Sequence, residues 1–148
     1  MENTFFKKSL IVFWTLFWTI TLWTDIVGGL SHFGILVKSW APDPNYPFLV
    51  QSLRMYNVPE WMPFFLFMLI LAGSALSSFS FIWACFALKK EKHIWMARAR
   101  VAFIISIIFW LTFFIADLLV MKFDLVENHM VQGGFELLCF FALYVLPD

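Results

Sequence analysis

Long apolar stretches constrain this chain more than any other feature of its sequence. A transmembrane helix needs about 20 consecutive, mostly apolar residues, and four stretches approach that length: residues 9–30, 62–88, 101–121 and 130–146. The chain is 62% hydrophobic and 14% charged, whereas soluble domains are about a quarter charged. A soluble fold of this size would leave too much apolar surface in water. We therefore expect a single all-α domain, a four-helix transmembrane bundle with the lipid bilayer around it.

The distribution of Lys and Arg predicts how this bundle is oriented. Seven of the ten Lys and Arg residues precede the first stretch or lie between the second and third, and the other three are Lys38, Arg54 and Lys122. Because cytoplasmic loops are enriched in Lys and Arg, we expect both termini in the cytoplasm, in a bacterial inner membrane. Residues 89–100 are interpreted as a loop that dips back toward the interface at Trp95 and Met96. The formal net charge of zero provides no basic field, so no nucleic-acid partner is expected.

The connection between the first two stretches is long and rich in proline. Residues 41–47 contain Pro42, Pro44 and Pro47, and proline cannot donate a backbone hydrogen bond inside a helix. This segment is therefore predicted to be an irregular outer loop. Residues 48–56 are predicted to form a short helix on the membrane interface.

Small residues in the second stretch favour close helix packing. Helices in lipid associate through tight contacts and hydrogen bonds, which small side chains allow. Gly73 and Ser77 have the small-xxx-small spacing of such contacts, as do Ser74 and Ser78. We expect this helix to lie at the centre of the bundle.

Three acidic residues lie inside the predicted spans: Asp25, Asp117 and Glu136. Each carboxylate costs about 2.5–3.5 kcal/mol at the centre of a membrane-spanning helix. At about 1.5 Å per residue, all three belong to the outer half of the bundle. Their shared depth on three helices predicts a polar intramembrane cluster.

Four more polar residues could extend this cluster: His32, Asp124, Glu127 and His129. Asp25 and His32 are seven residues apart, as are Asp117 and Asp124, and residues at that spacing share a helix face. Imidazoles and carboxylates suit a divalent metal, but also proton or quinol chemistry. Three interpretations stay open: a structural cluster that locks the bundle, a site for a quinone, proton or small ligand, and a bound metal. No cofactor is predicted outright.

Two short segments resemble known groups of small bacterial inner-membrane proteins. Residues 56–60, Tyr-Asn-Val-Pro-Glu, resemble the start of the second helix in DoxX-like proteins, which in some members are linked to quinone-coupled redox systems. Thr24 and Asp25, followed by the long proline-containing loop, resemble a group of uncharacterised small integral membrane proteins. Both resemblances imply a four-helix membrane fold, and neither assigns a site residue.

The sequence supports a ranked set of functions. No catalytic motif is present, and Cys85 and Cys139 lie in apolar runs without a CxxC partner, so an enzyme is not expected. The leading hypothesis is an accessory subunit that packs against a larger membrane protein or against further copies of itself. The alternative is a redox-linked protein that binds quinone or metal through the polar cluster. The third is a small oligomeric transporter.

Overall fold

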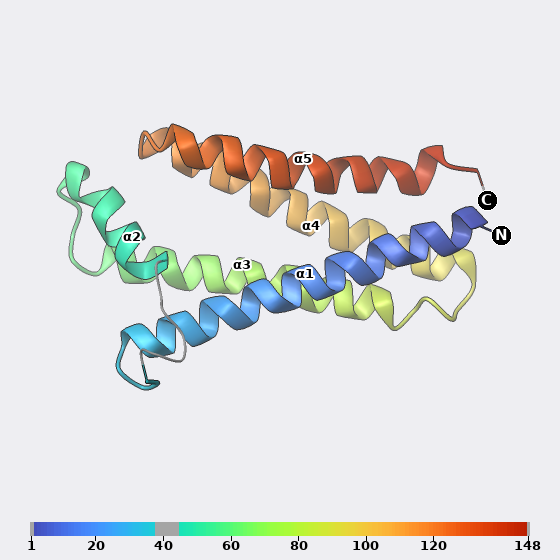
Figure 1. The fold of residues 1–148 in the computed structure, drawn as a ribbon, viewed down its shortest axis with the longest axis horizontal. Coiled ribbons are helices and arrows are strands. Elements are labelled where there is room, and N and C mark those ends of the chain that lie inside the picture. Colours follow the sequence, from blue (N-terminus) through green and yellow to red (C-terminus); the bar gives the residue numbers. More distant parts are fainter. Residues whose placement is uncertain (1, 38–44, 148) are drawn as a thin grey trace.

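The computed structural model describes residues 2–37 and 45–147. Its helices follow in the order α1 (Glu2–His32), α2 (Asn45–Leu53), the 3-10 helix η1 (Arg54–Tyr56), α3 (Met62–Cys85), α4 (Lys92–Leu119) and α5 (Phe123–Val145). The described residues form no strand, so the all-α prediction is confirmed for them. The four long helices run beside one another; both termini lie at one end of the bundle and α2 at the other (Figure 1). We call these the terminal end and the α2 end.

Three helices, not four, have the length and composition of a membrane span. They are α1, α3 and α4, so the chain is a small multi-pass membrane protein, and the prediction of four spans is wrong by this criterion. The predicted fourth stretch, residues 130–146, belongs to α5, which begins earlier at Phe123. The first half of α5 is polar, and this explains its low hydropathy: it carries Asp124, Glu127, Asn128, His129 and Gln132.

The bounds of the other long helices also differ from the prediction. The helix α1 extends beyond residues 9–30 in both directions, and α3 ends at Cys85. The predicted loop at residues 89–100 is wrong for most of its length, because α4 already begins at Lys92. No proline or glycine interrupts this segment, and Trp95 is buried with 2% exposure. Residues 92–100 therefore form the first turns of α4, with Trp95 buried in the bundle, and not the predicted loop.

A short helix follows the proline-rich connection, as predicted. It begins at Asn45, three residues before the predicted start, so Pro47 lies in its first turn. The missing N–H of a proline costs no intrahelical hydrogen bond there. The helix α2 packs against α1 and α3. Residues 38–44 of the predicted outer loop, including Pro42 and Pro44, lie outside the described residues.

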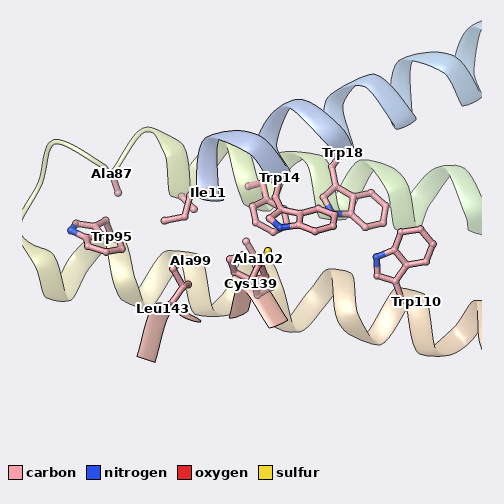
Figure 2. Close-up of a cluster of buried hydrophobic side chains, with 13 residues drawn as sticks. Ile11, Trp14, Trp18, Ala87, Trp95, Ala99, Ala102, Trp110, Cys139 and Leu143 are labelled. Atoms are coloured by element: carbon pink, nitrogen blue, oxygen red, sulfur yellow. The ribbon is translucent and has the colours of Figure 1, made fainter. Parts of the chain in front are cut away.

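The core of the bundle is aromatic, with small residues between the rings. Figure 2 shows the buried cluster extending along the helices from Trp95 to Trp110, with Trp14 and Trp18 of α1 between them. The helix α3 contacts α1, α2 and α4, while α5 packs chiefly on α4. In the described structure α3 therefore makes the most extensive contacts with other helices, and α5 is the most peripheral of the long helices.

Candidate functional site

A cavity of about 550 Å³ lies at the α2 end of the bundle, between all five α-helices. We call it the chamber. Its walls are mainly aromatic and aliphatic, with rings from α1, α3 and α4 and leucines from α2 closing the end. A few polar side chains share these walls: Thr21, Asp25, Asn45, Ser52, Ser74, Asp117, His129 and Gln132. Mostly apolar cavities of about 300–1,000 Å³ with a few convergent polar groups are typical of small-molecule sites.

Asp25 joins three helices at one wall of the chamber. Its side chain is buried, with 7% exposure. Ser74 of α3 donates a hydrogen bond of 3.0 Å from Oγ to Oδ2, and Asn45 of α2 donates one of 3.1 Å from Nδ2 to Oδ1. Asp25 therefore attaches the short helix α2 to the bundle, and its buried carboxylate accepts hydrogen bonds from both neighbouring helices.

Asp117 and His129 form a polar pair at another wall, between α4 and α5. The distance from His129 Nδ1 to Asp117 Oδ2 is 2.5 Å. The imidazole ring also packs against Trp110 and Phe113, with ring centroids 5.6 and 4.8 Å apart. A carboxylate on one ring nitrogen fixes the tautomer and orientation of a histidine. In the described part of the chain, no side chain hydrogen-bonds the other nitrogen, Nε2.

Glu136 lies behind the chamber wall and is fully buried. Trp110 Nε1 donates to its Oε2 at 2.7 Å, and Trp18 Nε1 lies 3.3 Å from its Oε1. Ser106 Oγ lies 2.5 Å from Oε1 and 3.1 Å from the carbonyl oxygen of Ala102. The rings of Trp18 and Trp110 line the chamber, so Glu136 holds two chamber walls in place without being part of the surface.

The three predicted acids therefore belong to three separate hydrogen-bond groups. Asp25 and Asp117 both line the chamber, whereas Glu136 does not. The same-face argument is wrong for Asp117 and Asp124, because α4 ends at Leu119 and the two residues lie on different helices. Asp117 instead pairs with His129 across the helix boundary.

The remaining predicted polar residues lie outside the chamber. His32 is exposed and its ring packs against Tyr46; Asp124 and Glu127 are exposed on α5. Within residues 2–37 and 45–147, no three His, Cys, Asp or Glu side chains come together as metal ligands. The residues described do not form the metal site that the sequence left open.

The small residues of α3 lie at its contacts with α1 and α4. Ser78 Oγ is 3.3 Å from Thr19 Oγ1 of α1, and Ser77 is fully buried. Ser74 reaches Asp25 as described above. Gly73 lies under the ring of Phe109 from α4, so closely that a Cβ on Gly73 would be 2.3 Å from Phe109 Cε2.

Sequence reasoning missed the aromatic half of the site. Trp18, Trp110, Phe109 and Phe113 all line the chamber, although periodicity alone gives them no function. A usable signal was present, since Trp is enriched at membrane interfaces but Trp18 and Trp110 lie well inside their spans. A buried indole N–H needs an acceptor, and a buried carboxylate needs donors, so these tryptophans could have been paired with Glu136.

The chamber has the chemistry to hold a lipid-soluble ring compound. Its aromatic walls suit a planar ring, and the neutral imidazole of a carboxylate-paired histidine can accept a hydrogen bond from a hydroxyl through Nε2. The protonated imidazolium can instead donate to a carbonyl oxygen. The resemblances to DoxX-like and other small membrane proteins stay predictions. No protein-family model, curated protein or solved structure matches this chain.

Proposed function

We propose that this protein is a small inner-membrane protein that binds a lipid-soluble molecule of the quinone class in the chamber. The observation that carries the proposal is the chamber itself, an aromatic cavity of about 550 Å³ with the Asp117–His129 pair in its wall. An apolar cavity excludes water, and the few polar groups then fix the orientation of the ligand. The ring of the ligand would lie among Phe109, Trp110 and Phe113.

The Asp117–His129 pair suits both redox states of such a ligand. With Nδ1 committed to Asp117, Nε2 of His129 is the atom left for the ligand. The imidazolium donates to a quinone carbonyl, while the neutral imidazole accepts from a quinol hydroxyl. A single side chain thereby has a hydrogen bond to offer to either form.

The arrangement of the helices supports a location for the chamber. Both termini lie at one end (Figure 1), together with Lys7, Lys8 and the basic segment that starts α4. By the preference of Lys and Arg for the cytoplasmic side, we place this end in the cytoplasm and the chamber toward the outer face. Since α5 returns along α4 to the terminal end, His129 and Gln132 of its polar half line the chamber, while Asp124 and Glu127 stay exposed near the outer face.

Binding of a short-chain benzoquinone to the full-length protein in mild detergent tests the proposal. Trp18 and Trp110 line the chamber, so a bound quinone should quench tryptophan fluorescence and saturate at one molecule per chain. Asp117→Asn should weaken binding about tenfold, the equivalent of about 1.4 kcal/mol, because a neutral amide orients the imidazole ring less firmly than a carboxylate does. Asp124→Asn, an exposed acid nearby, is the matched control and should bind normally. Unsaturable quenching that is equal in all three proteins would refute the chamber as the site.

A second candidate, the accessory subunit, is favoured by one face of α5. Exposed apolar side chains follow this peripheral helix at helical spacing: Val131, Phe135, Leu138, Phe141 and Val145. Because α5 lacks the overall composition of a lipid-facing span, this stripe suits another membrane protein or a second copy of the chain. A photo-crosslinker at Leu138 should then give one discrete product in native membranes, and only a lipid adduct would speak against it. Transport by an oligomer of this chain stays a prediction.

A further inference from the structure

Three aromatic rings in the chamber wall lie against glycines of a neighbouring helix. An added Cβ on Gly29 would be 2.9 Å from Phe67, and one on Gly133 would be 3.0 Å from Trp110. On Gly73 the Cβ would be only 2.3, 2.6 and 2.7 Å from three ring atoms of Phe109. Real Cβ atoms essentially never approach other atoms more closely than 3.0 Å, so Phe67 and Phe109 occupy the space that a side chain would need, whereas Trp110 would have to shift by a few tenths of an ångström.

The contact at Gly73 is the tightest of the three, and the ring that it involves has little room to move elsewhere. The ring of Phe109 is held between Gly73 on α3 and two aromatic neighbours, Trp18 and Phe113, whose ring centroids are 5.8 and 4.8 Å away. Both neighbours line the chamber, as Phe109 does. A side chain at position 73 would therefore push the ring of Phe109 away from α3 and toward the chamber.

We propose that Gly73 is a specificity-determining residue that sets the width of the chamber. Because it carries no side chain, Phe109 sits back against α3 and the chamber can admit a fused two-ring head. A larger residue at this position would restrict the chamber to a single ring. This inference rests on the proposed function and deepens it, since it assigns the ring size of the ligand to one contact between α3 and α4.

Two quinones of different width test the inference with the full-length protein in detergent. The probes are menadione, which has two fused rings, and a short-chain benzoquinone, which has one. Gly73→Ala should weaken menadione binding about tenfold or more, in line with the cost of overpacking an apolar site, and change benzoquinone binding about twofold or less. Gly134→Ala is the matched control on α5, where an added Cβ meets nothing within 4 Å, and it should change neither affinity.

A second substitution separates ring displacement from damage to the fold. Phe109→Ala removes the displaced ring, so the double variant Gly73→Ala/Phe109→Ala should regain the preference for menadione over benzoquinone, even though both affinities fall with the loss of a ring that contacts the ligand. If the single glycine variant does not fold, Phe109→Ala alone should still shift the preference toward menadione by about threefold or more. Equal losses of both probes in Gly73→Ala, or no rescue in the double variant, would overturn the inference alone. No saturable binding of either quinone to the unaltered protein would overturn the proposed function and this inference with it.

Discussion

At the terminal end of the bundle alanines face the large rings, whereas at the α2 end glycines do. Ala84, Ala87, Ala99 and Ala102 are all fully buried in the same cluster as Trp95 and Phe103, and Ala87 and Ala99 are the labelled alanines nearest to Trp95 in Figure 2. The alanine methyl groups occupy the space next to these rings, so the terminal end is closely packed. At the α2 end, Gly29, Gly73 and Gly133 let Phe67, Phe109 and Trp110 retract, and the space on the other side of the rings is the chamber.

Polar groups divide between the two ends in the same way. The carboxylates of Asp25 and Asp117 are in the chamber wall, and that of Glu136 is directly behind it. At the terminal end most basic residues lie instead at the surface, some of them against aromatic rings; Arg98, for example, lies 4.5 Å from the ring of Trp83. Lys7 is an exception, with 2% exposure. One bundle therefore combines a packed half, which provides stability, with an open half whose walls depend on buried hydrogen bonds.

Removal of the Glu136 side chain should have the largest effect on the unfolding free energy, because the chamber walls formed by Trp18 and Trp110 lose their hydrogen-bond acceptor. Glu136→Ala leaves the indole N–H groups of Trp18 and Trp110 buried without an acceptor, which should cost about 2–4 kcal/mol of unfolding free energy. Glu136→Gln keeps an acceptor and should cost less. Thermal unfolding in detergent measures both, and Glu127→Ala, an exposed acid on the same helix, is the control. Equal stability of Glu136→Ala and Glu127→Ala would show that the network does not hold the chamber walls.

The sequence predicted the class of fold because the length of an apolar stretch is a local property of the chain. The bounds of α4 and α5 are predicted less well, because they depend on contacts with other helices. Only the apolar second half of α5 indicates a span. The Lys and Arg residues at the start of α4 indicate a loop, although the helix already begins there. The acids at positions 25, 117 and 136 were identified because charge in a span is rare. Their partners were not, since hydrogen bonds such as Asp117 to His129 join different helices and leave no periodic pattern in one of them.

Replacement of two alanines on α4 by leucine, one in each half, should have an intermediate effect on the unfolding free energy and should separate the two halves. Ala102 is fully buried at the packed half, so Ala102→Leu should lower the unfolding free energy by about 1–3 kcal/mol through overpacking. Ala116 is about four helical turns further along the same helix and lines the chamber. Ala116→Leu should change stability by about 0.5 kcal/mol or less and reduce quinone binding instead.

The same two variants can also contradict the division into a packed half and an open half. Thermal unfolding and benzoquinone titration on both proteins give two stabilities and two affinities. If Ala116→Leu destabilises the protein as much as Ala102→Leu, the chamber is not open space in the folded protein. If Ala102→Leu weakens quinone binding without changing stability, the two halves are not independent.

Loss of a single contact at the α2 end should have the smallest effect and should be confined to the open half. The hydroxyl of Tyr56 donates to the carbonyl oxygen of Leu119, and Lys122 Nζ lies 5.3 Å from the ring of Phe48, so α2 and η1 are attached to the ends of α4 and α5. Tyr56→Phe removes about 0.5–1.5 kcal/mol of local stability, and hydrogen–deuterium exchange of residues 45–56 should accelerate about two- to tenfold while α1 and α3 keep their protection. Tyr144→Phe removes the acceptor of Arg100 at the terminal end and should leave exchange in α2 unchanged. Acceleration spread evenly over all helices would mean that the α2 end unfolds only with the whole bundle, and the chamber would then have no independent opening through which a ligand could enter.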